Sequence, residues 1–299
     1  MLIALGGATG VFLSGDLFEL LVFWEVVTFC LYLLIASGGQ SGVAATKAFV
    51  MTGIGDGALV LAGALIWAGT NSTSIAQISI AGRSWLSVCS FLLVTLAATT
   101  KAGALPLHTW LPTCAQYSDA SVMAFLPAGI DKLLWIYLLV ILVRQILPLG
   151  PGGLQLVLAC LGSATMIVAA MVALVQHDLK RLLAFHAVSQ VGYMILGIAR
   201  LTPVGILGGV FHMLNNVIYK PCLFLCAGAV ERRAGTSQLD RLGGLGRRMP
   251  LTFAACILAA LAISGIPPLN GFASKWMIYQ GIVQMGGKEG GLASQLWPV

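Results

Sequence analysis

Long apolar runs recur along the whole chain and restrict what it can fold into. Only 9% of the 299 residues are charged, whereas soluble domains average about 25%. A helix needs about 20 apolar residues to cross a hydrocarbon core of about 30 Å. We therefore expect an all-α membrane protein in which residues 1–299 form a single multi-span transmembrane domain. The runs lie at about residues 1–13, 17–36, 46–69, 85–107, 120–147, 153–175, 182–199, 204–229 and 251–282.

The two ends of the chain look incomplete in this pattern. The first run has about 13 residues, which is too short to cross a membrane as a helix. The segment from Gly286 to Val299 carries no further apolar run. The sequence predicts about eight complete spans plus a partial first one, and indicates a fragment of a longer protein.

Basic residues in the short loops predict the orientation. Cytoplasmic loops of membrane proteins carry the excess of Lys and Arg, so the loop near residue 40 and the loop at 230–250 are expected on the cytoplasmic side. One side carries Lys47, Lys180, Arg181, Arg232, Arg233, Arg241, Arg247 and Arg248, and the other carries Arg83, Arg144, Arg200 and Lys288.

Five ionisable residues lie inside apolar runs, on different predicted helices: Glu25, Lys101, Lys132, Lys220 and Lys275. A charged lysine at the centre of a bilayer costs roughly 3 kcal/mol on insertion scales. One such lysine could snorkel to an interface, but groups spread over several spans are typical of ion pathways and proton relays. The alternative is a structural scaffold, in which the lysines only pin helices together.

The stretch Phe211–Leu225 places a polar stripe on an apolar helix. His212, Asn216 and Lys220 stand at i, i+4 and i+8, so they share one face. This face is interpreted as a segment of an ion path. The alternative is a packing contact in which the histidine and the asparagine bond a neighbouring helix.

Two of the predicted helices contain proline-rich interruptions. One has Pro106 and Pro112 shortly after Lys101, and the other has Pro267 and Pro268 shortly before Lys275. Proline removes a backbone donor and clashes with the preceding turn, so both helices are expected to break. Paired broken helices inside a membrane indicate inverted repeats with a site between them.

Four further residues are candidates for supporting roles. Asp56 lies among glycines that allow a neighbouring helix to approach closely, and Asp131 precedes Lys132, so the two side chains point about 100° apart on a helix. Lys180 follows a predicted helix start. His186 is interpreted equally well as a core histidine and as a relay.

The sequence argues against several other classes of function. Of the seven cysteines none forms a CxxC pair, and we see no iron–sulfur site, metal site, nucleotide-binding loop or other cofactor site. The formal net charge of +6 is distributed over short loops and does not indicate nucleic-acid binding. We expect no catalytic centre within this chain, so any redox chemistry belongs to another polypeptide.

Six ordered motifs resemble the antiporter-like membrane subunits shared by respiratory complex I, Mrp cation/proton antiporters and membrane-bound energy-converting hydrogenases. They are GVFLSGDLFELLVFWE, KAFVMTGIGD, TTKAGALPLHTWLP, HDLKRLLAFHAVSQVGYMILG, HMLNNVIYKPCLFLCAG and SGIPPLNGFASKW, and the resemblance that they carry extends over nearly all of the chain. The resemblance implies an inverted-repeat antiporter-like bundle of about fourteen spans, of which this chain would hold the central ones.

The resemblance also implies roles for individual residues. Glu25 with Lys101 would form a polar pair, Lys132 and Lys220 would be central relays, and Lys275 would be the exit-side lysine. His212 matches the first histidine of the family's HxxxH pattern, whereas Asn216 stands at the second. Asparagine cannot carry a proton as histidine does.

The favoured function is that of a proton-translocating membrane subunit of a redox-driven complex, a complex I-like NADH/quinone oxidoreductase or an energy-converting hydrogenase, in a prokaryotic cell membrane. Its expected partners are the other membrane subunits, redox subunits among them, together with H⁺ and the lipid bilayer. The alternative is an Mrp-type Na⁺/H⁺ antiporter subunit without redox drive. The choice of complex, of ion and of electron donor stays open.

Overall fold

The computed structural model describes residues 1–38, 42–80, 84–148 and 152–283. The loop centred on residue 40, Arg83, Lys288 and the segment from Gly286 lie wholly or partly outside the described residues. In chain order the helices are α1 (Leu2–Leu13), α2 (Leu17–Ala36), α3 (Gly42–Thr70), α4 (Trp85–Ala102), α5 (Trp110–Tyr117), α6 (Ala120–Phe125), η1 (Leu126–Ile130), α7 (Asp131–Ile141), η2 (Leu142–Ile146), α8 (Gly153–Leu174), α9 (Leu179–Ala199), α10 (Pro203–Ala234), η3 (Leu239–Arg241), α11 (Leu245–Arg248), α12 (Pro250–Ser264) and α13 (Asn270–Val283).

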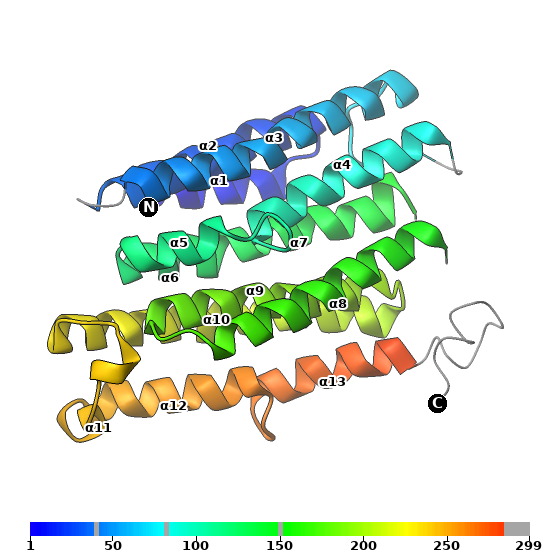
Figure 1. Ribbon diagram of the computed structural model, residues 1–299. Coiled ribbons are helices and arrows are strands. Elements are labelled where there is room, and N and C mark those ends of the chain that lie inside the picture. Colours follow the sequence, from blue (N-terminus) through cyan, green and yellow to red (C-terminus); the bar gives the residue numbers. More distant parts are fainter. Residues whose placement is uncertain (39–41, 81–83, 149–151, 284–299) are drawn as a thin grey trace.

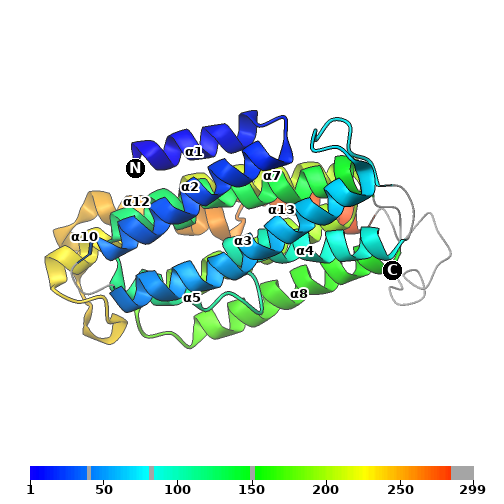
Figure 2. The same cartoon turned by 90° about the horizontal axis from the view of Figure 1, so that it is seen from above.

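The long helices run side by side as an antiparallel bundle, with the connections gathered at its two ends (Figure 1). Seven helical segments of the described part are long and apolar enough to cross a membrane. The inner ones are the continuous α6–η1–α7–η2 segment and α9, each with 83% of its apolar window buried, whereas α2 and α8 have 33%. Seen from above, α1 and α8 lie on opposite outer sides (Figure 2). The expected all-α, multi-span membrane fold is therefore confirmed.

Both predicted breaks are present. α4 ends at Ala102, and α5 begins at Trp110 after a non-helical segment that contains Pro106. α12 ends at Ser264, and α13 begins at Asn270. In Figure 1 each pair of half-helices continues along one line of the bundle, so the chain is interrupted inside the bundle and not at its end.

The two breaks begin in the same way. Gly103 and Gly265 follow α4 and α12 with φ angles of 74° and 85°. This left-handed conformation satisfies the last carbonyls of a helix and is disfavoured for residues with a Cβ. Each glycine N–H bonds a carbonyl of the preceding turn, so both half-helices end in a defined cap.

An inverted repeat accounts for this similarity. Asp16 caps the N-terminus of α2 and accepts from the hydroxyl of Thr73, while Asp178 caps α9 and accepts from that of Ser237. The spacing from Asp16 to Asp178 equals the spacing from Gly103 to Gly265. Because α2 and α9 run in opposite directions, as do α4 and α12 (Figure 1), the two halves have inverted topology.

Small residues bring α8 and α9 into close contact. A Cβ on Gly192 would lie 2.4 Å from the backbone nitrogen of Met166 and 2.6 Å from the carbonyl oxygen of Gly162. The Ser189 hydroxyl donates to the carbonyl of Met166 across the same contact at 2.9 Å. Membrane helices associate through such close backbone approach, because lipid supplies no hydrophobic driving force between them.

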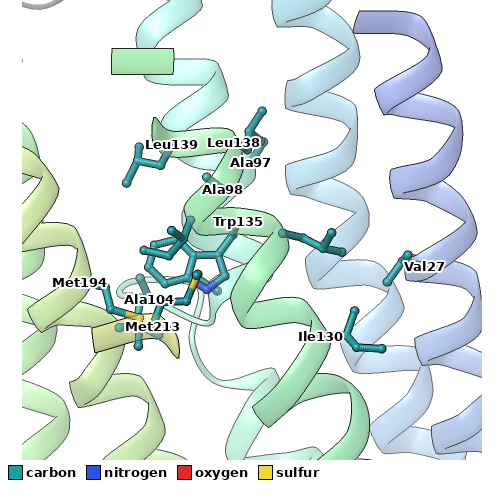
Figure 3. Close-up of a cluster of buried hydrophobic side chains, with 14 of the residues drawn as sticks. Val27, Ala97, Ala98, Ala104, Ile130, Trp135, Leu138, Leu139, Met194 and Met213 are labelled. Carbon is teal, nitrogen blue, oxygen red and sulfur yellow. The ribbon is translucent and has the colours of Figure 1, made fainter. Parts of the chain in front are cut away.

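The central core joins the two halves through α7. Figure 3 shows Trp135 of α7 packed beside Ala104 at the first break and beside Met194 and Met213 of α9 and α10. Leu138, one turn on, faces α4 and is also fully covered. The core thus surrounds the break in α4, where the polar residues of the next section gather.

The described basic residues outside the apolar runs are divided between the two ends of the bundle as expected. Eight lie at the end that holds the α5–α6 turn and the loop after α10, and Arg144 and Arg200 lie at the other end (Figure 1). The list of eight is Lys47, Lys180, Arg181, Arg232, Arg233, Arg241, Arg247 and Arg248.

Candidate ion-translocation site

Lys101 lies at the end of the half-helix α4, directly before the break. Its side chain is 1% exposed, and its Nζ donates to the Thr28 hydroxyl at 2.7 Å and to the carbonyl of Trp24 at 3.2 Å. Nζ also stands 4.3 Å from the centroid of the Trp24 ring, a cation–π contact. Lys101 is thus held against α2 by neutral groups.

Trp24 links Lys101 to an acid on α3. Its Nε1 donates to Asp56 Oδ1 at 2.7 Å, and both side chains are buried. Asp56 Oδ2 has no hydrogen-bond partner among the described residues. The glycine-rich segment of α3 permits this arrangement, because a Cβ on Gly55 would meet Thr100 at 2.9 Å.

Glu25 occupies a different environment from the one expected. It is exposed on α2 and forms no ion pair with Lys101 within the described residues. The prediction of a buried Glu25 is wrong, because Trp24, the preceding residue, takes the inward face, and the next position is turned about 100° away. Glu25 still interacts electrostatically with Asp56 and Lys101.

Lys132 lies at the start of α7 and binds the end of α4. Its Nζ donates to the carbonyl of Ala102 at 2.6 Å, and its side chain is 1% exposed. The last carbonyls of a helix lack intrahelical partners and carry the negative end of the helix dipole. Asp131, the residue before it, is fully buried, and neither of its carboxylate oxygens has a hydrogen-bond partner in the described part.

The polar stripe of α10 is buried along its whole length. His212, Asn216 and Lys220 are each 0% exposed. His212 Nδ1 lies 2.9 Å from the Ser274 hydroxyl, and Nε2 lies 3.0 Å from Gln190 Oε1, so its two nitrogens connect α13 and α9. The Asn216 amide has no hydrogen bond of normal geometry within the described residues.

Lys220 binds a backbone carbonyl, as Lys101 and Lys132 do. Its Nζ donates to the carbonyl of Leu183 on α9 at 2.8 Å. α10 continues unbroken past Pro221. Lys220 interacts electrostatically with Lys132 and with His186, which places it between the two halves of the bundle.

Lys275 binds the end of α12 at the second break, as Lys132 binds the end of α4 at the first. Its Nζ donates to the carbonyls of Ile263 and Ser264 at 2.8 and 3.3 Å, at the end of the half-helix α12. It also stands 4.9 Å from the ring centroid of Tyr193. The side chain is half-buried, not fully buried as expected. His186 is half-buried as well and interacts electrostatically with Lys275 and His212.

Lys180 lies at the end of the bundle with the basic loops. Its Nζ pairs with Glu231 Oε2 at 3.0 Å, and the two side chains are 5% and 36% exposed. The pair lines a cavity of about 530 Å³ between the α5–α6 turn and the end of α10, together with Ser118, Asp119 and Arg232.

Several of the predicted residues lie within electrostatic range of one another. Asp131 interacts electrostatically with Lys101, Lys132 and Asp56, Lys132 with Lys220, and Lys275 with His212. Sequence reasoning did not assign roles to Trp24, Thr28 or Ser274, which hold Lys101 and His212. The sequence gives little indication of such roles, because a tryptophan or a hydroxyl residue in an apolar helix is usually a packing residue.

Comparison with known proteins gives consistent matches. The family model described as NADH:quinone oxidoreductase/Mrp antiporter, TM, matches residues 14–294. The chain is 32% identical over 291 residues to NADH-quinone oxidoreductase subunit N of Desulforudis audaxviator, covering 95% of this chain and 58% of that protein. It is 32% identical over 281 residues to a subunit of the Na(+)/H(+) antiporter of Alkalihalophilus pseudofirmus, covering 92% of this chain and 57% of that protein.

A solved structure gives the same result for the fold. A chain in the Mrp complex of a Dietzia species superposes with a TM-score of 0.90 at 31% identity, over 96% of this chain and 55% of that chain. The chain therefore spans little more than half of the length of each of these proteins.

Proposed function

Because the chain belongs to the NADH:quinone oxidoreductase/Mrp antiporter membrane family, we propose that it carries the proton-translocating track of a membrane subunit in a redox-driven complex of the complex I or energy-converting hydrogenase kind. Protons pass along the residues between Lys101 and Lys275. Residues 1–299 serve as one transmembrane domain.

The observation that carries this proposal is the kind of partner that each buried lysine has. Lys101, Lys132, Lys220 and Lys275 all donate to carbonyl or hydroxyl oxygens, and none forms an ion pair with a carboxylate within the described residues. A carboxylate would hold the ammonium in its charged form. A neutral oxygen accepts from an amine as well as from an ammonium, so these lysines can release a proton and keep a partner.

Two features extend the track to its ends. The cavity beside Lys180 and Glu231 offers water a route toward the centre, and the positive-inside rule supports a cytoplasmic location for that end. Glu25 is an exposed carboxylate in the middle of α2. Since a bare carboxylate is costly in lipid, its exposure supports a neighbouring subunit at this face.

The proposal is tested by proton pumping in vesicles that contain the host complex, with electron transfer measured in the same samples. Lys101→Ala and Glu25→Ala are expected to reduce pumping, and Arg144→Ala serves as a control because Arg144 is exposed at one end of the bundle. Unchanged pumping with both variants would remove the two residues from the mechanism.

A second candidate is an Mrp-type Na⁺/H⁺ antiporter subunit that works without redox drive. The observation that favours it is the TM-score of 0.90 with a chain of an Mrp complex. Sodium-dependent pH changes in vesicles without any electron donor would support this candidate. Pumping that requires the donor and ignores sodium would support the first.

A further inference from the structure

Asp131 is a buried acid that the lysine series leaves unexplained. Its side chain is 0% exposed, and both carboxylate oxygens lack a hydrogen-bond partner within the described residues. An ionised carboxylate in such a place costs several kcal/mol unless it is paired and hydrogen-bonded. Buried polar groups in native proteins almost always have a hydrogen-bond partner. We therefore expect Asp131 to be protonated, or to bind a water or another group.

A π-helical turn directly before Asp131 sets the direction of its side chain. The turn before it, η1, is π-helical, and the Asp131 N–H bonds the carbonyl of Leu126, five residues back. One wide turn shifts the register of everything that follows, and such turns are frequent at functional sites. As a result, Asp131 and Lys132 both begin α7 beside the break in α4.

A second unsatisfied group lies one turn along the same face. Trp135 is four residues after Asp131, is fully buried, and its Nε1 also lacks an acceptor in the described part of the chain. Figure 3 shows the Trp135 indole lying between α7 and the break, near Ala104. The two unsatisfied acceptor oxygens and one unsatisfied donor are therefore on one side of α7.

Charged groups from several helices act on Asp131. Lys101 of α4, Lys132 of α7 and Asp56 of α3 interact with it electrostatically. Of the other helices packed against α7, α10 brings Lys220, α9 brings His186, and α1 carries no ionisable side chain. Asp131 is thus within electrostatic range of two lysines, Lys101 and Lys132, and each of these binds other oxygens.

We propose that Asp131 is a proton-binding residue between Lys132 and Lys101, a step of the track that the lysines alone do not supply. The Lys101 ammonium gives a proton to a carboxylate oxygen of Asp131, which leaves a neutral amine and a carboxylic acid. The acid then gives the proton to the neutral amine of Lys132. No electron moves in either step. This inference rests on the proposed function for its direction, but proton binding at Asp131 stands apart from it.

The test uses the complete subunit in its host complex, reconstituted in lipid. Infrared difference spectra recorded across a pH titration, in H₂O and in D₂O, report the carbonyl stretch of a protonated carboxylic acid. Wild type is expected to show such a band, Asp131→Asn to lack it, and Asp131→Glu to keep it at a shifted position. Asp240→Asn is the matched control, since Asp240 is an exposed acid in the short helix η3 and its loss leaves the band in place.

Proton pumping in the same preparations supplies the second readout. Asp131→Asn is expected to reduce the pumping rate by about 100-fold or more, the low end for loss of one proton-transfer group, and Asp131→Glu to restore a measurable part of it. A spectrum without an Asp131 acid band at any pH, or full pumping by Asp131→Asn, overturns the inference. If the band is present and lost as expected while wild type itself pumps no protons, the proposed function fails and the proton-binding residue stands.

Discussion

Replacing Lys132 by methionine distinguishes a proton-transfer role of this lysine from a purely structural role. Lys132→Met keeps the length of the side chain and removes its charge. If the lysine only pins α7 to α4 through the carbonyl of Ala102, the variant should be less stable. If it is kept for proton transfer at a cost in stability, the variant should be at least as stable as the wild type.

The contacts of Lys132 allow the magnitude to be estimated. Its ammonium has three donors, and only the one to the Ala102 carbonyl, at 2.6 Å, is used within the described residues. Losing this charge-assisted bond costs about 1.5–3 kcal/mol, and leaving the carbonyl without a partner costs about 1–3 kcal/mol. Removing a buried charge returns several kcal/mol per ion. The losses and the gain are of similar size, so we expect the free energy of unfolding to change by less than about 2 kcal/mol.

The assay is reversible unfolding of the protein in mixed micelles by titration with SDS, with pumping measured on the same variants in vesicles. Leu134→Met is the matched control, because Leu134 is 0% exposed on the same helix and Leu-to-Met exchanges cost less than about 1.5 kcal/mol. Lys132→Met should lose pumping and keep its stability. A loss of about 2 kcal/mol or more, with pumping intact, would refute the reasoning and favour the scaffold interpretation.

Three further predictions concern stability, measured by the same titration. Trp24→Phe should lower the free energy of unfolding by about 1–3 kcal/mol, because it leaves both oxygens of Asp56 without a donor. Adding Asp56→Leu should recover most of this loss. If Trp24→Phe does not change the stability, water satisfies the Asp56 carboxylate. Gly192→Ala should cost about 2 kcal/mol or more, since the new Cβ meets backbone at 2.4 Å, and no change in stability would contradict the close α8–α9 contact. Glu231→Gln should cost about 1–3 kcal/mol by leaving the Lys180 ammonium unpaired in a mostly buried place, whereas a stabilised variant would show that the pair is not formed.

The sequence allowed the helical runs and both breaks to be predicted, because length, hydropathy and proline are local properties. It also indicated which helices carry buried lysines, since a lysine within an apolar run is costly in lipid and is therefore expected to face protein. Lys101, Lys132 and Lys220 are indeed covered almost completely.

The direction of a side chain in an apolar helix could not be predicted. In a soluble helix the contrast between polar and apolar faces reveals the buried side, but lipid and protein core are both apolar. Nothing in α2 therefore distinguishes the inward Trp24 from the outward Glu25. The lack of a hydrogen-bond partner at the Asp131 oxygens depends on the π-helical turn before this residue and on neighbours from distant parts of the chain. It could therefore not be predicted from the sequence either.

The central claim is that protonatable side chains on separate membrane helices share one hydrated track. The most direct measurement is an experimental density map of the host complex, at a resolution that shows ordered water. We expect water between Lys132 and Lys220, and at the Asn216 amide, which is fully buried and has no hydrogen bond of normal geometry within the described residues. Dry, apolar packing between these side chains would contradict it.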